Sequence, residues 1–302
     1  TELLHASSRD KMRFRDFFKG KTRPVISFEI YPPKTKRGLH ALKSRLLPKL
    51  IELGPSYITV TYGAGGSTQG ETLEIASTVK NELGLEAACH LTCVGASKSE
   101  IDDIIARIRA EGINNIVALR GDPPTGQDKF VAHEEGFTHA NELVEHIRAT
   151  EDSNSRAGLA VAGYPEKHLE AESLDVDIEN LKRKVDADAD IVITQLFYDN
   201  NVFYDYRDKV AAAGIDIPII PGLMPIQSRS QVQRIASLCG ATLPKNLLGQ
   251  IEDAGDDDEA VKVIGTEQCT AQSQGLIRNG APGIHYYVLN RSPQIRRIVR
   301  AL

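Results

Sequence analysis

Eight short apolar runs alternate with longer amphipathic segments along this chain of 302 residues, and this alternation constrains the fold more than any other feature. The apolar runs begin at Val25, Tyr57, Ala87, Asn115, Leu159, Asp190, Ile217 and Gly283. Most are almost continuously apolar, as parallel strands covered on both faces are. The segments between them have helical spacing, as in the stripe Ile101, Ile104, Ile105 and Ile108. Eight strand–helix units predict an α/β fold, the (β/α)8 TIM barrel, with residues 1–302 as a single catalytic domain.

A doubly wound open sheet is the alternative fold. Dinucleotide-binding proteins of that class carry a glycine fingerprint after the first strand. Here the first strand is followed by YPPKTKRG, which has no such fingerprint. The long interval between the seventh and eighth predicted strands is expected to hold extra helices. Residues 1–23 are expected to form an N-terminal helical extension.

Charge and cysteine content bear on the kind of partner. The net charge of −5 gives no reason to expect binding to nucleic acid or to an anionic membrane surface. No run approaches the roughly 20 apolar residues of a membrane-spanning helix. The four cysteines are few and irregularly spaced, which favours a reduced cytoplasm over a disulfide scaffold. We therefore expect a cytoplasmic protein.

Polar residues follow several of the predicted strands. Glu29 lies in the apolar stretch VISFEIYPP, where an ionised carboxylate is costly unless it is paired. In a barrel, catalytic side chains gather at the carboxyl ends of the strands. Other strands carry or end in His90, Arg120, Asp122, Gln195 and Tyr287. We expect these side chains and Glu29 to meet at one rim of the barrel.

Structural interpretations of the same residues stay open at this point. Glu29 could pair with an arginine purely as structure, and His90 could be a satisfied core histidine. Cys89 and His90 are adjacent on a strand and so point to opposite faces, which argues against a metal site. The stretch GAGGSTQG could cradle a phosphate, but it matches no Walker pattern.

Eight motifs together resemble the methylenetetrahydrofolate reductase family. They are SFEIYPPK, VTYGA, CHLTC, NIVALRGDPP, VAGYPEKH, NLKRKVDADADIVITQLFYD, IIPGLMPIQS and HYYVLNR, and they occur in the family's order. The resemblance implies the same barrel, FAD as cofactor, NADH or NADPH as hydride donor, and a homo-oligomer. It implies a ping-pong reduction of 5,10-methylenetetrahydrofolate to 5-methyltetrahydrofolate, within one-carbon and methionine metabolism. The family's C-terminal regulatory domain is expected to have no counterpart here.

The resemblance matches Glu29 to the family's general acid. Methylenetetrahydrofolate must open its five-membered ring to an iminium before it accepts hydride, and ring opening needs a proton on the leaving nitrogen. A carboxyl group can supply that proton only if it stays protonated near neutral pH. An apolar strand end raises the pKa of a carboxyl group, so we expect a raised pKa at Glu29.

The resemblance also assigns substrate and flavin contacts. Asp122 is matched to an aspartate beside the flavin that also contacts the pterin, so it counts as a catalytic, cofactor-binding and substrate-binding residue. The further substrate contacts are Gln195, Gln231, Tyr287 and Arg291. The remaining FAD contacts are Thr61, Gly63, Ala64, His90, Arg120, Gly121, Ala140, Ala162, Tyr164, His168, Ala171, Asp177, Asn180, Arg183 and Lys184.

Two positions depart from the family pattern. His139 precedes Ala140 where many members have an aromatic residue, and Ile235 stands where some bacterial members have a phenylalanine. Isoleucine can pack but offers no π face, so the preference for NADH or NADPH is left open. Two rival functions also stay open: a flavin-free pterin methyltransferase barrel, and a non-catalytic subunit that binds folate or flavin.

Overall fold

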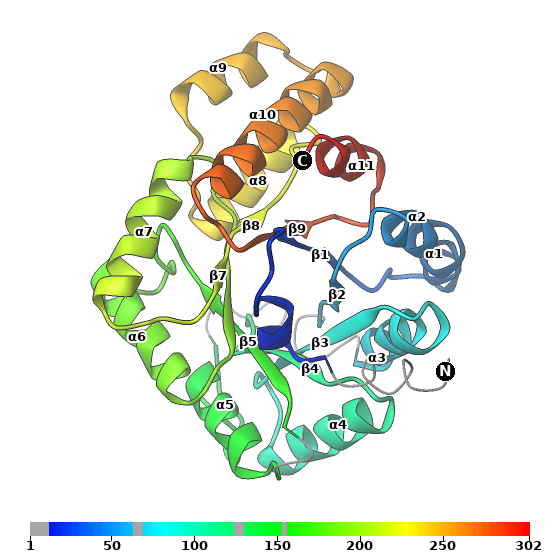
Figure 1. Cartoon of the computed structure of the whole chain (residues 1–302), viewed down its shortest axis with the longest axis vertical. Coiled ribbons are helices and arrows are strands. Elements are labelled where there is room, and N and C mark those ends of the chain that lie inside the picture. The colour runs from blue at the N-terminus through cyan, green and yellow to red at the C-terminus, as the bar shows by residue number, and fades with distance from the viewer. Residues whose placement is uncertain (1–11, 63–68, 124–129, 153–155) are drawn as a thin grey trace.

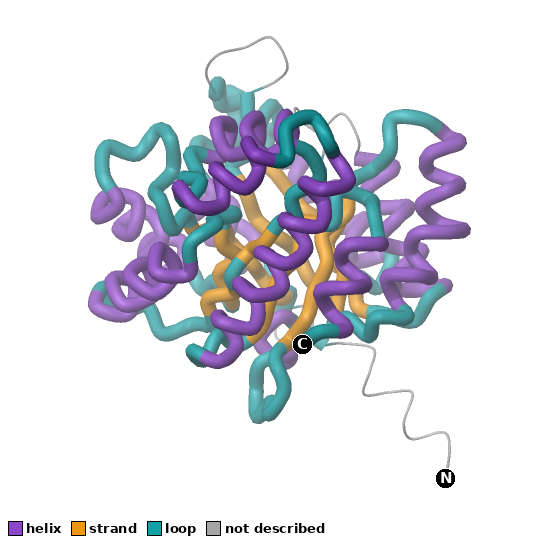
Figure 2. Tube along the Cα trace, turned by 90° about the horizontal axis from the view of Figure 1, so that it is seen from above, coloured by secondary structure: helices purple, strands orange, loops and turns teal. Residues whose placement is uncertain are grey.

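The computed structural model describes residues 12–62, 69–123, 130–152 and 156–302. Nine parallel strands in this part form one sheet that curves into a nearly closed barrel, with helices around it (Figure 1). The strands are β1 Val25–Ile30, β2 Tyr57–Val60, β3 Glu86–Thr92, β4 Asn115–Leu119, β5 Gly158–Gly163, β6 Ile191–Thr194, β7 Ile219–Ile220, β8 Gly222–Leu223 and β9 Gly283–Tyr287. Figure 2 shows the strands gathered at the centre and the helices outside them. The predicted barrel is confirmed.

The barrel comes closest to closing at Pro221. The sheet order is β7-β6-β5-β4-β3-β2-β1-β9-β8, so its two end strands are consecutive in the chain and only Pro221 separates them. Proline has no backbone N–H and interrupts a ladder of hydrogen bonds. The predicted seventh strand is therefore two short segments, one pairing with β6 and the other with β9. The predicted eighth strand is β9.

The helices pack around the outside of the barrel and lie between successive strands. They are α1 Lys36–Ala41, the π-helix η2 Leu42–Leu46, α2 Leu47–Ile51, α3 Gln69–Ser77, the π-helix η4 Thr78–Glu82, α4 Lys98–Ala110, α5 Ala140–Ala149, α6 Leu174–Asp186, α7 Asn200–Ala212, α8 Arg229–Cys239, α9 Lys245–Asp253, α10 Asp258–Arg278 and α11 Pro293–Arg300. Three of them, α8, α9 and α10, occupy the interval between β8 and β9 (Figure 1).

Helix α4 shows why a segment of this kind folds against the sheet. Ser97 caps its N-terminus together with Glu100, so that two otherwise unpaired backbone donors are satisfied. The four isoleucines of the predicted stripe are all buried in the main core between helices and strands. Burial of such a stripe stabilises the fold by about 1.5–3 kcal/mol for each side chain.

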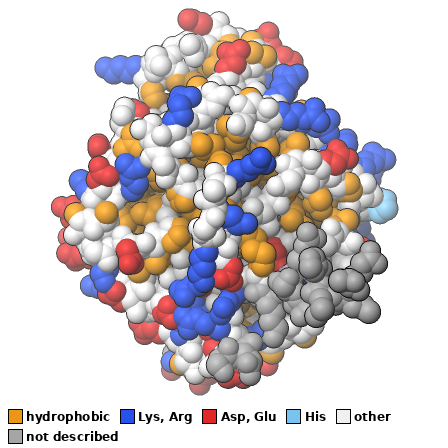
Figure 3. All heavy atoms as spheres, in the orientation of Figure 1, with side chains coloured by type: hydrophobic (Ala, Val, Ile, Leu, Met, Phe, Trp, Pro, Cys, Tyr) orange, Lys and Arg blue, Asp and Glu red, His pale blue; other side chains and the backbone are white. Residues whose placement is uncertain are grey.

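The N-terminal end of the barrel is covered by η1, a turn of 3-10 helix at Phe14–Phe17. Phe14 and Phe17 are buried, and each ring centroid lies 5.1 Å from that of Tyr57 in the barrel interior. This turn is the helical part of the described residues 12–23, within the predicted N-terminal extension. Figure 3 shows the same face as Figure 1, with Lys and Arg side chains gathered near its lower centre.

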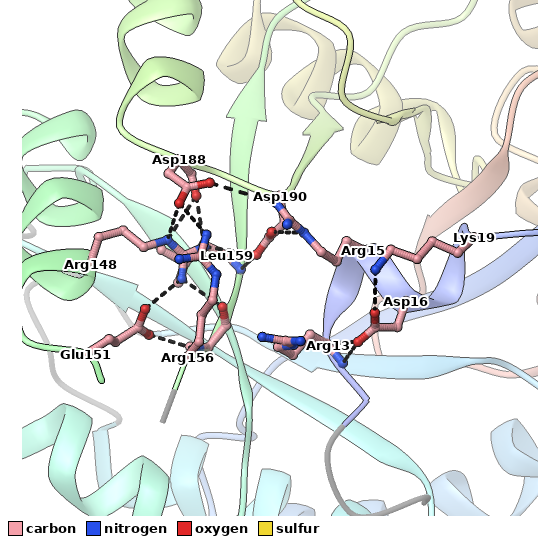
Figure 4. A network of polar contacts seen from close by, with 11 residues as sticks. Arg13, Arg15, Asp16, Lys19, Arg148, Glu151, Arg156, Leu159, Asp188 and Asp190 are labelled. Atoms are coloured by element: carbon pink, nitrogen blue, oxygen red, sulfur yellow. Dashed lines mark hydrogen bonds and ion pairs between the residues drawn. The ribbon is translucent and has the colours of Figure 1, made fainter. Parts of the chain in front are cut away.

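An ion network fixes η1 to this end of the barrel (Figure 4). The side chain of Asp190 is 1% exposed and lies between Arg15, 2.5 Å away, and Arg148, 3.0 Å away. The backbone N–H of Leu159 also donates to the carboxylate of Asp190. A buried carboxylate is tolerated because these partners satisfy it. This end of the barrel is therefore structural, and the opposite end is free for chemistry.

No helix in the described ranges is long and apolar enough to cross a membrane.

Candidate active site

A cavity of about 770 Å³ opens at the carboxyl ends of the strands. Its volume lies in the upper part of the range for small-molecule and cofactor sites. Most of the residues that the sequence predicts for the site line it: Glu29, Thr61, His90, Arg120, Gly121, Asp122, Ala140, Ala162, Tyr164, His168, Ala171, Asp177, Asn180, Arg183, Lys184, Gln195 and Tyr287. The strand ends thus bring together residues that are far apart in the sequence.

Four predicted residues are not in this lining. Gly63 and Ala64 lie outside the described residues. Gln231 lies near the start of α8, where its side-chain nitrogen is 3.6 Å from the sulfur of Met224, which does line the cavity. Arg291 is exposed, four residues beyond the end of β9. Gln231 therefore stands next to the cavity, and Arg291 is not part of its lining.

Glu29 points into the barrel at the floor of the cavity and meets two histidines. Its Oε2 atom lies 3.2 Å from Nε2 of His90 and 3.3 Å from Nε2 of His285. His90 comes from β3 and His285 from β9, so the two rings approach the carboxylate from different strands. The open question about Glu29 is thereby answered: its partners are histidines rather than an arginine.

The expectation of a raised pKa at Glu29 is wrong for this arrangement. Burial alone would raise the pKa, but the nearby His90 and the hydrogen-bonded His285 together lower it to about 2. The carboxyl group of Glu29 is therefore easily ionised in this site. Glu29, His90 and His285 thus form one cluster of groups that can carry a proton.

His285 was missed from the sequence, although strand alternation could have found it. In GIHYYVL, Ile284, Tyr286 and Val288 are buried against the helices, so His285 and Tyr287 share the interior face. Of these two residues, only Tyr287 was predicted from the sequence to belong to the site. The pairing of β1 with β9 places Ser27 opposite His285 and Glu29 opposite Tyr287.

A second group of side chains forms a basic wall of the cavity. Nζ of Lys184 donates to the carbonyl oxygen of Ala162 at 2.6 Å and lies 5.9 Å from the centre of the Tyr164 ring. Burial lowers the pKa of Lys184 to about 8, against the opposing charge of Asp177. Arg183 lines the same wall. Such a wall suits an anion, because it presents two basic side chains to the cavity.

Arg120 closes another side of the cavity. Its guanidinium forms two hydrogen bonds with Glu170, at 2.6 and 2.9 Å, and lies 4.9 Å from the centre of the Phe130 ring. This fork holds the guanidinium plane in one orientation. Glu170, which also lines the cavity, was not among the predicted site residues.

Gly121 brings the backbone close to its neighbours. It has a φ of +91°, and a Cβ atom there would lie 2.7 Å from Cγ1 of Val94 and 2.9 Å from Cβ of Thr92. Only glycine fits this conformation and this space without strain. The hydroxyl of Thr92 is buried beside it and has no hydrogen-bond partner among the described residues. A ligand lying against Gly121 could satisfy that hydroxyl.

The comparison with protein families identifies the family of the chain. The model of the methylenetetrahydrofolate reductase family matches residues 13–302. This chain is a member of the methylenetetrahydrofolate reductase family. The resemblance seen in the eight motifs is thus confirmed over nearly the whole chain.

Curated relatives of the family fall into two groups by length. Methylenetetrahydrofolate reductase (NADH) 1 of Arabidopsis thaliana is 43% identical over 88% of this chain, which covers 46% of the relative. The 5,10-methylenetetrahydrofolate reductase of Escherichia coli strain K12 is 35% identical over 99% of this chain and 97% of the relative. The chain therefore spans about half the length of the plant relatives and nearly the full length of the bacterial one.

A solved structure shares the fold at low sequence identity. An uncharacterized protein from Clostridium thermocellum, described as binding two copies of 5-methyl-5,6,7,8-tetrahydrofolic acid, superimposes with a TM-score of 0.63 and 15% identity. The match covers 94% of this chain and 95% of that chain. At this identity the likeness shows the fold alone.

The two departures from the pattern of methylenetetrahydrofolate reductases both lie on the cavity wall. His139 and Ile235 line it, and Ile235 faces it from α8 one turn before Cys239. Burial raises the pKa of the Cys239 thiol to about 11, so this thiol is protonated and unreactive at neutral pH. The α8 wall is therefore neutral and mostly apolar. No group of three or more potential metal ligands occurs in the described part of the chain.

Proposed function

We propose that this chain reduces 5,10-methylenetetrahydrofolate to 5-methyltetrahydrofolate, with FAD as the bound cofactor and NADH or NADPH as hydride donor. One observation carries the proposal: the proton-holding cluster around Glu29 shares a cavity with the carboxylate of Asp122, the amide of Gln195 and a basic wall. Proton donor, pterin contacts and anion-binding groups are the components that this reaction needs. Membership in the family supports the same reaction.

The residues of the cavity fit FAD. Arg183 and Lys184 would hold its diphosphate, because they offer two cations on one wall. Gly121 allows a flat ring system to approach the backbone closely, and the unpartnered hydroxyl of Thr92 is available there. When bound, the flavin supplies a hydride acceptor and donor that no side chain can replace.

The chain's own residues position the folate and supply the proton. We propose that Asp122 accepts hydrogen bonds from the amino and ring N–H donors of the pterin. Gln195 and Gln231 would add amide contacts, and exposed Arg291 would meet a carboxylate of the folate tail. Tyr287 is fixed for substrate contact because its hydroxyl donates to the carbonyl oxygen of Thr194 at 2.7 Å. Glu29 then passes the proton of its cluster to the leaving nitrogen.

We further propose that the two substrates use the cavity in turn, which is a ping-pong mechanism. Of the two donors we favour NADH, because the plant relatives carry NADH in their names. We also propose a cytoplasmic homo-oligomer, as the resemblance implies. Stopped-flow rates of flavin reduction with NADH and with NADPH test the donor, and light scattering tests the oligomer.

The purified protein tests the proposal directly. We expect a yellow protein whose flavin absorbance bleaches when NADH is added without oxygen. Addition of methylenetetrahydrofolate should restore the absorbance and yield one 5-methyltetrahydrofolate for each flavin, measured by mass spectrometry. A protein that takes up no FAD would contradict the cofactor, and would leave the flavin-free methyltransferase as the better explanation. Flavin that bleaches but forms no methyltetrahydrofolate would contradict the substrate.

A further inference from the structure

His285 is the least exposed member of the cluster around Glu29. Its side chain is 0% exposed and it is not part of the cavity lining, whereas His90 lines the cavity. Its ring stacks on Tyr57 at a centroid distance of 6.5 Å and stands edge-on to Tyr287 at 5.4 Å. The ring is therefore held in one orientation and cannot itself touch a substrate.

Both ring nitrogens of His285 have partners inside the barrel. Nε2 lies 3.3 Å from Oε2 of Glu29, and Nδ1 lies 2.8 Å from Oγ of Ser27. Ser27 is fully buried and is the strand partner of His285 across β1 and β9. A chain of hydrogen bonds thus runs from Ser27 through His285 to Glu29.

A serine hydroxyl suits both protonation states of the ring. When the ring is neutral after it has lost its Nε2 proton, the remaining hydrogen is on Nδ1 and donates to Oγ of Ser27. When the ring is a cation, Nδ1–H donates to Oγ of Ser27. Neither state leaves a buried ring nitrogen without a partner, so the ring can gain or lose a proton at little cost.

The two histidines are not equivalent. Nε2 of His90 is close enough to Glu29 for an ion pair but has no hydrogen bond in the described residues, because the direction is unfavourable. His285 has both the distance and the direction. The groups that face Glu29 are His90 from β3, with His285 and Tyr287 from β9. Of these, His285 is the one placed to exchange a proton with the carboxylate.

We propose that His285, oriented by Ser27, is a positioning residue that stores the proton which Glu29 delivers to the folate. This deepens the proposed function and rests on it. The N–H bond at Nε2 of His285 breaks as an O–H bond forms at Glu29. That O–H bond then breaks as an N–H bond forms at the leaving nitrogen of the substrate. No electrons change hands in these steps, and water returns one proton to the neutral ring in each turnover.

A proton held on His285 explains how Glu29 can act as an acid although its own carboxyl group is easily ionised. The nearby His90 and the hydrogen-bonded His285 lower the pKa of Glu29 against the effect of burial, so Glu29 does not keep a proton for itself at neutral pH. The pair of Glu29 and His285 loses its shared proton at a higher pH than the carboxyl group alone would, because the two groups titrate together.

The variants His285→Asn and Ser27→Ala test the store in the flavin-loaded protein. We expect the rate of flavin reoxidation by methylenetetrahydrofolate to fall at high pH, and this fall would report loss of the shared proton. We expect His285→Asn to move the fall to lower pH by at least about one unit. Ser27→Ala should move it in the same direction by less, because Nδ1–H loses its acceptor. Flavin reduction by NADH and the affinity for FAD should stay at wild-type values in both.

A matched control removes a hydroxyl that the proposal does not use. Thr59 is the strand partner of Glu29 on β2, is fully buried, and its hydroxyl has no hydrogen-bond partner in the described residues. Thr59→Val should leave the pH of the fall unchanged. If the reoxidation rate falls at the same pH in His285→Asn and in the wild type, the proton-storing role of His285 is overturned, even if the rate itself is lower. A merely structural role would change the rate and leave this pH unchanged.

A second measurement does not depend on turnover. In protein with ¹³C-labelled glutamate carboxyl groups, the signal of Glu29 is the one lost in Glu29→Gln. His285→Asn should raise the pKa of that carboxyl group, since a donor to its ionised form is lost. An unchanged titration of Glu29 would overturn the proposal. A wild-type protein that binds FAD but never reduces the folate would instead contradict the proposed function.

Discussion

Lys184 should give FAD binding a pH dependence that follows from its surroundings. Its ammonium group lies between the carbonyl oxygen of Ala162, the ring of Tyr164 and the charge of Asp177. Burial lowers the pKa of Lys184 to about 8 although Asp177 opposes this. Without a ligand, a large fraction of the Lys184 side chain is therefore neutral in mildly alkaline solution.

The size of the effect follows from that pKa. A diphosphate binds the charged form of Lys184, so the affinity for FAD is complete below pH 8 and is lost as the pH rises above it. The charged fraction falls from about nine-tenths at pH 7 to about one-tenth at pH 9. The dissociation constant of FAD should therefore rise about tenfold over this range, which is roughly 1.4 kcal/mol.

Titration of the flavin-free protein with FAD, followed by flavin fluorescence, measures this change. Lys184→Arg is the matched variant, because a guanidinium stays protonated over the whole range and should remove the slope. Arg183→Ala should weaken FAD binding equally at each pH and keep the slope. His168 adds nothing to the slope, because burial and the charge of Arg120 lower its pKa. Equal slopes in the wild type and in Lys184→Arg would refute the reasoning.

Two further predictions concern other parts of the barrel. Urea unfolding should show that Gly121→Ala destabilises the protein by more than Gly280→Ala. Both glycines have positive φ, where a side chain costs about 1–2 kcal/mol. Only at Gly121 would a Cβ atom also collide with Val94. Equal losses of unfolding free energy in the two variants would show that the close approach of Gly121 to Val94 does not affect stability. Asp190→Asn should cost about 3–5 kcal/mol, because Arg148 and its partners lose a buried carboxylate, while FAD affinity stays unchanged. A loss under 1 kcal/mol by the same assay would contradict a structural role for this network.

The barrel could be predicted because each strand is marked by its own residues. Apolar runs such as that from Asn115, and the isoleucine stripe of α4, report burial directly, and both lie where they were expected. The division of the seventh strand depended on a single missing N–H at Pro221, in a run that otherwise reads as one strand. Local pattern alone does not show where a barrel closes, since closure depends on pairing between distant strands.

Many residues expected at the site do line the cavity, but the electrostatics around Glu29 were not predicted. Glu29 reads as a carboxylate in an apolar strand, and burial alone does raise its pKa. The opposing histidines come from β3 and β9, and His285 is 256 residues away in sequence. Neither distance could be seen in the sequence, although strand alternation does put His285 inside the barrel. Glu170 was missed for the same reason, because its link to Arg120 joins two different loops.

The central claim is that the cluster around Glu29 supplies the proton for folate reduction and has no part in flavin reduction. Anaerobic stopped-flow measurement of both half-reactions in wild type and Glu29→Gln tests it most directly. We predict equal rates of bleaching by NADH, and reoxidation by methylenetetrahydrofolate that is at least about a hundredfold slower in the variant. Equal reoxidation rates, or equal losses in both half-reactions, would contradict the account.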